Sequence, residues 1–269
     1  MQYNENKMDN HDLENFKSNG YLCIDKFLDE GQVHWLEGRI DRILNEFGHK
    51  SSFMEESVMA YGESWIFCEN MLSYDQELAS FYLEGPLTQL AALLLETNRV
   101  FFLRDQTYYK YNNGEETPWH QDGLFIPSDN LQSITFWVPF HDINSKQSPM
   151  SYIRHSNRYC YLGSQFDRYH TYETFRAVEE SKGMEIDVFD SMKVGQILAH
   201  DGWAMHGSPS MNDGQTRKAI VVVYSKYEIT LDSTATMLGC HPNLRAQAQQ
   251  IRKGNAGSYQ SLCKLLSRT

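Results

Sequence analysis

Apolar residues recur at helical spacing in the first part of the chain. Leu36, Ile40 and Ile43 stand three or four positions apart, which is the spacing of one face of an amphipathic helix. A similar spacing returns further along, around a Gly85-Pro86 break. The predicted helical segments are 9–47, interrupted by a short extended piece at 21–24, and about 75–97; residues 9–97 are thus a helical N-terminal part.

The pattern changes after residue 98 to that of β-strands. Some segments are rich in aromatic and β-branched residues, and 133–140 alternates between polar and apolar positions. Helices followed by many antiparallel strands predict an α+β protein, in which N-terminal helices brace a β-sandwich or barrel. The predicted strands are 100–111, 133–140, 186–189, 196–199 and 217–229, within a core of about 98–230.

Two segments fall outside this regular pattern. Residues 154–183 fit neither period and are rich in Tyr and Arg, which favours a long functional excursion or lid. Residues 240–269 are predicted to form a C-terminal helical tail. Because no internal repeat and no Pro/Gly-rich linker divides the chain, we expect residues 1–269 to form a single domain.

Charge excludes several classes of partner. The chain has 269 residues, of which 41% are hydrophobic, enough for a sizeable core. Asp and Glu number 35 against 24 Lys and Arg, so the formal net charge is −11. Because an acidic protein is repelled by phosphate groups, we expect neither sequence-independent nucleic-acid binding nor adhesion to anionic membranes.

The cysteines and the N-terminal residues favour a cytoplasmic location. The five cysteines are odd in number and scattered, and none forms a Cys-x-x-Cys pair, a pattern typical of reduced thiols. Residues 1–14 are polar and lack the apolar stretch of a signal peptide. No run approaches the roughly 18 apolar residues of a transmembrane helix. We therefore expect a soluble cytoplasmic protein.

A His-x-Asp motif carries the first candidate chemistry. On extended backbone, His120 and Asp122 project from one face and offer two adjacent ligands to a divalent metal. His206 lies far downstream in a His-Gly-Ser segment. Two histidines and one carboxylate with open coordination positions form the facial triad of non-heme Fe(II) oxygenases. His200 competes with His206 as the distal ligand.

Arg217 adds a candidate anion site to this motif. It lies 11 residues beyond His206 at the head of the strongest predicted strand, after the turn residues 212–214. We expect a hairpin that brings Arg217 beside the strand of His206. Its guanidinium can hold the distal carboxylate of a dicarboxylic cosubstrate through two hydrogen bonds, and Ser208 can add a hydroxyl donor. This spacing fails if His200 is the ligand.

Together these residues resemble the phytanoyl-CoA dioxygenase family of Fe(II)- and 2-oxoglutarate-dependent oxygenases. The resemblance spans about residues 12–228. It implies a double-stranded β-helix core, that is, a cupin-like jelly roll. The matching parts are Asn19-Gly20-Tyr21, His120-Gln121-Asp122, Trp137 in the segment 135–138, His206-Gly207-Ser208, Asn212 and Arg217.

The resemblance also implies cofactors and roles for individual residues. Fe(II) would be held by His120, Asp122 and His206, with 2-oxoglutarate and O2 as cosubstrates. The implied cosubstrate residues are Arg217 and Ser208, which hold the distal carboxylate, Gln106 and Trp137, which line the pocket, and Lys110 as a further candidate.

One segment departs from the family pattern. Residues 144–150 lack the expected glycine-containing turn, and 153–157 replace a Pro-Gly-Ser-His segment. We expect this departure to alter the loop beside the site, where substrate residues cannot be transferred from the family. We expect it to leave the iron and cosubstrate positions untouched.

Local charge suggests the class of substrate. Residues 154–176 hold four arginines against two acidic residues, together with many aromatic ones. Guanidinium clamps and aromatic walls suit a small polar, anionic or zwitterionic metabolite such as an amino acid, a phosphonate or a natural-product intermediate. The candidate substrate residues are Arg104, Phe125, Arg154, Arg158 and Trp203.

The predicted reaction is hydroxylation of an unactivated C–H bond, with release of succinate and CO2. An acyl-CoA hydroxylase of the same family is an alternative, but no basic surface for the CoA phosphates and no long apolar channel is evident in the sequence. A zinc hydrolase on the same three ligands is a further alternative that gives Arg217 no role. A non-catalytic jelly-roll protein is the third. The oligomeric state is left open.

Overall fold

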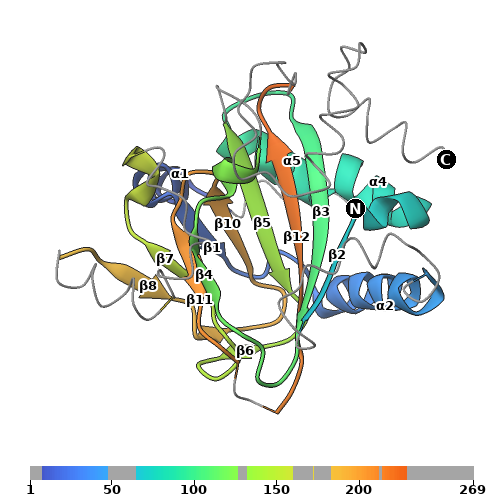
Figure 1. Cartoon of the computed structure of the whole chain (residues 1–269). Helices are drawn as coiled ribbons and strands as arrows, with labels where there is room; N and C mark the ends of the chain where they lie inside the picture. The colour runs from blue at the N-terminus through green and yellow to red at the C-terminus, as the bar shows by residue number, and fades with distance from the viewer. Residues whose placement is uncertain are drawn as a thin grey trace, which may run out of the picture.

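Two antiparallel sheets lie across from each other and form the core of a jelly roll (Figure 1). The computed structural model describes residues 8–47, 65–126, 132–159, 172, 183–211 and 214–228. The large sheet consists, in spatial order, of β1 (Tyr21–Ile24), β10 (Ile197–Asp201), β5 (Ser133–Pro139), β12 (Arg217–Ser225), β3 (Phe101–Lys110) and β2 (Trp65–Glu69). The small sheet consists of β4 (Thr117–His120), β11 (His206–Ser208), β7 (Ser151–Ile153) and β8 (Ile186–Val188), and β6 (Ile143–Asn144) pairs with β9 (Ser191–Met192).

Four α-helices among the described residues of the N-terminal part confirm the predicted helical segments. The first begins at a capping box between Asp9 and Asp12 and ends at Gly20, whose φ of 86° is the left-handed conformation that glycine adopts readily. Asp75 caps another helix, and Pro86 begins the next, where its missing N–H costs nothing. The helices are α1 (Asn10–Asn19), α2 (Glu30–Phe47), α4 (Gln76–Glu84) and α5 (Pro86–Leu94).

The helices supply one side of the main hydrophobic core, and the outer face of the large sheet supplies the other. Leu36 of α2 and Leu90 of α5 are fully buried and belong to the same apolar cluster as Phe136 and Val222 of the sheet. Burial of each such side chain stabilises the fold by about 1.5–3 kcal/mol. The helices therefore hold the large sheet rigidly from behind and leave its inner face for the site.

The two-residue period of the strands sends different side chains to the two faces of the large sheet. On β3, Tyr109 joins the helix-side core, whereas its neighbour Lys110 faces inward to Ser148 and Ser208. All seven residues of β5 are buried, because helices cover one of its faces and the small sheet the other. The alternation in its sequence therefore separates two buried environments.

Two expectations about the strands are wrong. β11 and β12 form no hairpin, since β11 pairs with β4 and β7 in the small sheet and β12 pairs with β3 and β5 in the large one. The chain after β11 thus crosses between the sheets, and Arg217 approaches from the opposite layer. Residues 65–69, within the predicted helical part, form the edge strand β2, because a short aromatic and β-branched run gains more from pairing with β3.

Other expectations concern residues outside the described part. Most of 154–183 and the whole of 240–269 fall there, so the predicted lid and tail stay predictions.

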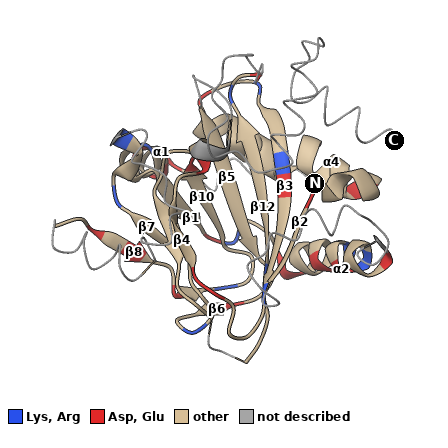
Figure 2. Cartoon of the chain, in the orientation of Figure 1, with Lys and Arg blue, Asp and Glu red and all other residues tan. Residues whose placement is uncertain are grey.

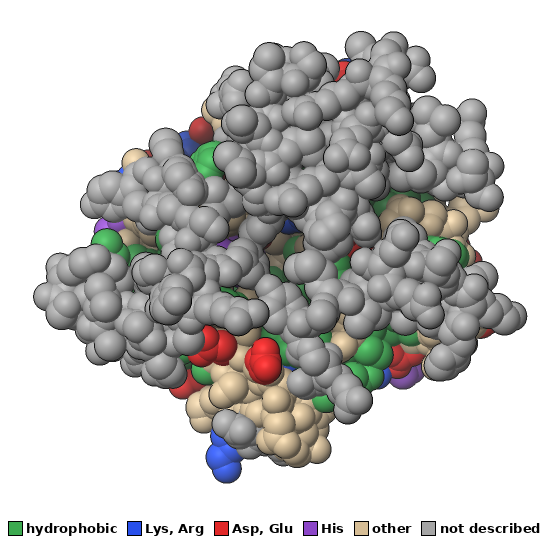
Figure 3. Space-filling view, viewed as in Figure 1, with side chains coloured by type: hydrophobic (Ala, Val, Ile, Leu, Met, Phe, Trp, Pro, Cys, Tyr) green, Lys and Arg blue, Asp and Glu red, His purple; other side chains and the backbone are tan. Residues whose placement is uncertain are grey.

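Charges on the described ribbons are scattered (Figure 2), and acidic and hydrophobic side chains lie near one another on the face shown in Figure 3. Among the described helices, none combines the length and the apolar character needed to cross a bilayer.

Candidate active site

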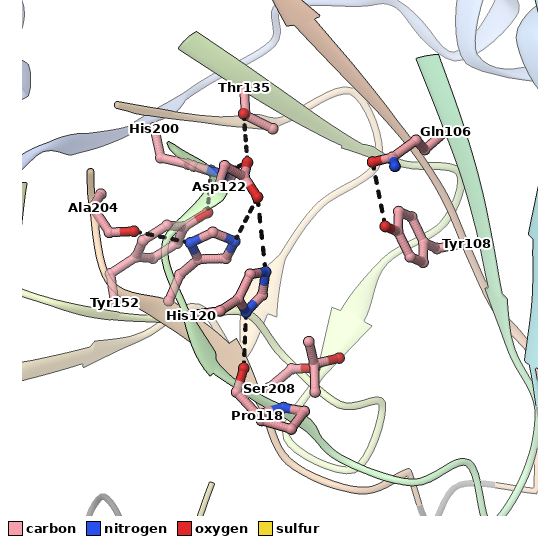
Figure 4. Close-up of polar contacts among 12 residues, drawn as sticks. Gln106, Tyr108, Pro118, His120, Asp122, Thr135, Tyr152, His200, Ala204 and Ser208 are labelled. Atoms are coloured by element: carbon pink, nitrogen blue, oxygen red, sulfur yellow. Dashed lines mark hydrogen bonds and ion pairs between the residues drawn. The ribbon is translucent and has the colours of Figure 1, made fainter. Parts of the chain in front are cut away.

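Three potential metal ligands converge between the two sheets. His120 ends β4, Asp122 begins the short 3-10 helix η4 (Asp122–Phe125), and His206 begins β11. One ligand atom from each lies within 4.8 Å of the others. The Asp122 Oδ1 atom is 3.8 Å from the Nε2 atoms of both histidines (Figure 4). This is the donor set of two imidazoles and one carboxylate that suits Fe(II).

Strand pairing and a small residue bring these ligands together. His206 stands directly opposite His120 in the β11–β4 pair, and their ring centroids are 4.2 Å apart. A Cβ atom on Gly207 would lie 2.9 Å from the Thr117 carbonyl oxygen of β4. Glycine at this position therefore permits the close approach of the strands that carry the two histidines.

Hydrogen bonds fix the tautomer of each candidate ligand. The Nδ1 atom of His120 donates to the Pro118 carbonyl at 2.8 Å, and that of His206 donates to the Ala204 carbonyl at 3.0 Å. Because a carbonyl oxygen only accepts, both protons sit on Nδ1. The Nε2 lone pairs consequently face the space beside Asp122, as a metal ligand requires.

The electrostatics keep these groups in their ligand forms. Burial lowers the pKa of His120, and it lowers the pKa of His206 well below the usual range, with help from the neighbouring imidazoles. Burial alone would raise the pKa of Asp122, but the hydrogen bond from His200 and the nearby His206 and Arg104 lower it well below its usual range. Neutral imidazoles beside an ionised carboxylate need release no proton when a cation binds.

His200 lies beside the triad in a different role from a ligand. Its Nε2 atom is 3.1 Å from Asp122 Oδ2, a carboxylate oxygen that only accepts, so Nε2 carries a proton (Figure 4). Thr135 donates its hydroxyl to the same oxygen at 2.6 Å. This geometry favours His206 over His200 as the distal ligand.

A second group of residues, the cationic cluster, consists of Lys110, Arg217, Ser148 and Ser208. Lys110 and Arg217 stand directly opposite each other on β3 and β12, and both are buried. The Lys110 Nζ atom donates to Ser148 Oγ at 2.8 Å and to Ser208 Oγ at 3.3 Å. The Arg217 Nη1 atom donates to the Ser148 carbonyl, and its buried Nε atom has no hydrogen-bond partner among the described residues.

The cationic cluster has the electrostatics of an anion site. Burial, and then Arg217, lower the pKa of Lys110 well below its usual range, and burial lowers the pKa of Arg217 to about 10. Within the part of the chain that the structure describes, no carboxylate forms an ion pair with either cation. Burial makes the charged forms of Lys110 and Arg217 costly, and a bound carboxylate would relieve that cost.

The other predicted cosubstrate residues lie on the same inner face. The Arg217 guanidinium lies over the Trp137 ring, 5.5 Å from its centroid. Gln106 accepts a hydrogen bond from the Tyr108 hydroxyl at 3.3 Å (Figure 4). It also donates to the Glu69 carboxylate. Trp137 therefore borders the cationic cluster, whereas the contacts of Gln106 are with neighbouring strand residues.

The predicted substrate residues are dispersed. Arg104 acts electrostatically on His120 and Asp122 from β3. Trp203 packs against a small cluster of Leu103, Ile126 and Val223. Arg154 forms ion pairs with Asp187 and Glu185, Arg158 donates to Ser18, and the side chain of Phe125 lies outside the described part. The substrate roles stay predictions, and Arg104 has the surroundings that suit one best.

Three residues of the site were missed by sequence reasoning. Thr135 donates a hydrogen bond to Asp122, and the Tyr152 hydroxyl bonds to His200 beside it. Ser148 accepts hydrogen bonds from both Lys110 and Arg217. Thr135 shares a strand face with Trp137, which was the available signal. Ser148 lies within residues 144–150 and contacts both Lys110 and Arg217, so this segment adjoins the predicted cosubstrate positions, contrary to the expectation that it leaves them untouched.

Comparisons with known proteins find a matching family model and solved structures of similar fold. A family model described as phytanoyl-CoA dioxygenase matches residues 16–219. A search of curated proteins finds no match. Among solved structures, the α-ketoglutarate-dependent carbocyclase SnoK from nogalamycin biosynthesis superposes with a TM-score of 0.67 and 18% identity, over 86% of this chain and 89% of SnoK. EctD from S. alaskensis, crystallised with 2-oxoglutarate and 5-hydroxyectoine, superposes with a TM-score of 0.67 and 18% identity, over 84% of this chain and 78% of EctD. EvdO2 from Micromonospora carbonacea var. aurantiaca, complexed with 2-oxoglutarate, superposes with a TM-score of 0.61 and 17% identity, over 87% of this chain and 97% of EvdO2.

Proposed function

The chain belongs to the phytanoyl-CoA dioxygenase family, and on that premise we propose that it hydroxylates a small anionic or zwitterionic metabolite at an iron held by His120, Asp122 and His206. It is an iron- and 2-oxoglutarate-dependent oxygenase, and hence an oxidoreductase. Bound Fe(II) supplies the chemistry that couples O2 and 2-oxoglutarate to oxidation of the substrate, with succinate and CO2 as coproducts. The protein supplies the ligands, the position of the cosubstrate and the orientation of the substrate.

The convergence of the three ligand atoms is the observation that carries the proposal. His120 and His206 each donate from Nδ1 to a backbone carbonyl, which directs their Nε2 lone pairs toward Asp122. The lowered pKa of Asp122 keeps its carboxylate ionised. Three protein ligands leave coordination positions for a cosubstrate and for O2. Neither a zinc hydrolase nor a non-catalytic protein would require an anion-binding cluster beside the three ligands.

The cationic cluster is proposed to bind the distal carboxylate of 2-oxoglutarate. Arg217 offers an Nε–H that is unpartnered within the described part of the chain, and Lys110 and Ser208 add donors from two other strands. Ser208 is two residues beyond His206 on the same strand, about 6–7 Å along it. A dicarboxylate anchored at the cluster can therefore direct its opposite end toward the metal ligands.

The substrate class rests on Arg104 and on charge. Arg104 shares the inner side of β3 with the cluster and lies near enough to lower the pKa values of His120 and Asp122. A cation beside the metal ligands favours a substrate with an anionic group. The EctD structure contains the small molecule 5-hydroxyectoine, and SnoK acts in nogalamycin biosynthesis, which supports a small metabolite over an acyl-CoA.

Substrate-dependent succinate release tests the proposal. Amino acids, phosphonates and acyl-CoA thioesters are incubated with the enzyme, Fe(II), 2-oxoglutarate and O2, and the products are analysed by mass spectrometry. We expect turnover with a small anion and a mass increase of one oxygen atom. His206→Ala should abolish it, whereas His34→Ala, on the exposed side of α2, should not. Turnover confined to acyl-CoA thioesters would contradict the substrate class.

A further inference from the structure

The two carboxylate oxygens of Asp122 face different partners. Oδ1 lies 3.8 Å from the Nε2 atoms of both His120 and His206. Oδ2 accepts hydrogen bonds from Thr135 at 2.6 Å and from His200 at 3.1 Å (Figure 4). Only Oδ1 is thus directed at the space that the two histidines share.

His200 is itself fixed by a second hydrogen bond. The Tyr152 hydroxyl lies 3.0 Å from His200 Nδ1, and since Nε2 carries the proton donated to Asp122, Nδ1 accepts from Tyr152. Tyr152 is fully buried, and His200 is 2% exposed. Water therefore does not compete for these two bonds, and the orientation of the imidazole is determined by the protein.

Strand register places the two donors and the tyrosine. His200 on β10 pairs directly with Thr135 on β5, so both donors come from adjacent positions of the large sheet. Tyr152 on β7 pairs directly with His206 on β11 of the small sheet. The array of Tyr152, His200 and Asp122 thus joins the two layers across the candidate metal centre.

From this geometry we propose that His200, held by Tyr152, is a positioning residue that keeps Asp122 a ligand through one oxygen only. The proposal rests on the proposed function, because it assumes the metal at His120, Asp122 and His206. A carboxylate free to turn can bind a metal through both oxygens and occupy a further coordination position. The bonds from His200 and Thr135 to Oδ2 oppose that rotation and leave this position for the cosubstrate.

Substitutions that remove or retain the two hydrogen bonds test the proposal. His200→Phe keeps a ring of similar size but loses both bonds, whereas His200→Gln retains a donor for Asp122 and an acceptor for Tyr152. Tyr152→Phe removes only the hydroxyl. The matched control is Tyr224→Phe, which removes a buried hydrogen bond of 2.6 Å from its hydroxyl to the Tyr82 carbonyl on the helix side of the large sheet.

Anaerobic titration with Co(II) provides a readout that does not depend on turnover. It reports the metal affinity and, through the ligand-field absorption, the coordination number. We expect His200→Phe to weaken binding about 10–100-fold and to change the ligand-field absorption as Asp122 turns to bind through both oxygens. His200→Gln should restore both properties toward wild type, Tyr152→Phe should give a smaller change in the same direction, and Tyr224→Phe should give none.

The outcomes separate this inference from the proposed function. If the wild-type protein bound no Co(II), the proposed metal site itself would be wrong. If it bound Co(II) but His200→Phe and Tyr152→Phe kept wild-type affinity and spectrum, only the positioning role would be overturned. Loss of binding in His200→Gln as severe as in His206→Ala would also overturn it, because His200 would then be a ligand.

Discussion

Individual hydrogen bonds determine what each histidine of the site can do. His120 and His206 donate through Nδ1 to backbone carbonyls and present Nε2, whereas His200 donates through Nε2 to Asp122. The same side chain is therefore a candidate ligand in two places and a hydrogen-bond donor to a ligand in the third. Three further expectations follow at this scale.

Replacement of Arg217 by lysine should weaken cosubstrate binding more than metal binding. Lysine keeps the charge but loses the planar fork, including the Nε–H that has no partner among the residues that the structure describes. Loss of one charge-assisted hydrogen bond corresponds to about 1.5–3 kcal/mol, or roughly a 10–100-fold higher Kd for 2-oxoglutarate. Calorimetric titration with the metal-loaded protein measures this, and an unchanged Kd in Arg217→Ala would refute the clamp.

Replacement of Lys110 by methionine should have opposite effects on stability and on binding. In the protein without cosubstrate, the substitution removes an ammonium group whose charged form is disfavoured by burial, so the free energy of unfolding should rise by about 1 kcal/mol or more. Binding of 2-oxoglutarate should weaken at the same time. Denaturation and titration of one protein sample give both values. A destabilised variant with unchanged cosubstrate affinity would show that Lys110 is only structural.

The lowered pKa values of His120 and His206 predict how stability depends on pH without metal. The unfolded chain takes up protons at these residues as the pH falls through about 6.5, while the folded protein does not. The free energy of unfolding should therefore decrease between pH 7 and 5, roughly. The lowered pKa of Asp122 acts only below about pH 4.

The control for this pH dependence is His206→Asn, which removes one titrating group. Urea denaturation of the metal-free proteins should give a shallower decrease with falling pH for the variant than for the wild type. Parallel curves would contradict the assignment of the lowered pKa to His206.

Helices and strands were predictable where they are long enough to show a clear hydrophobic periodicity. The helices between residues 10 and 94 and the strands β3, β5 and β12 follow from local spacing, which the sequence contains in full. The short strand β2 was not predicted, because its five residues carry too little pattern to separate strand from helix or turn. Which sheet a strand joins is a property of the assembled core, and this is why the hairpin of β11 and β12 was wrong.

Gly207→Ala should separate β11 from β4 and weaken the metal site. The added Cβ would lie 2.9 Å from the Thr117 carbonyl oxygen, so the strands must shift. We expect a loss of about 1–3 kcal/mol in stability and weaker Co(II) binding.

The matched control is Gly38→Ala on the exposed side of α2, where a Cβ meets nothing within 4 Å. It should stabilise the protein by about 0.5–1 kcal/mol and leave metal binding unchanged. Thermal denaturation and Co(II) titration of the two variants measure these effects. Equal metal affinity in both would contradict the role given to Gly207.

On the scale of the whole molecule, the site depends on two sheets held at a fixed separation. The metal ligands come from the small sheet and the turn after β4, and Arg217, Lys110, Thr135 and His200 come from the large sheet. Sequence motifs predicted the ligand set and Arg217, since these residues have a fixed spacing. They missed Ser148 and Tyr152, because the contacts of these two arise only when the layers pack.

Anomalous X-ray diffraction at the iron edge, from crystals grown without oxygen in the presence of Fe(II) and 2-oxoglutarate, tests the central claim most directly. The account predicts one iron peak bound by Nε2 of His120, Nε2 of His206 and Oδ1 of Asp122. It also predicts that the distal carboxylate of 2-oxoglutarate contacts Arg217 and Lys110. An iron peak ligated by His200, or a cosubstrate carboxylate away from the cationic cluster, would contradict it.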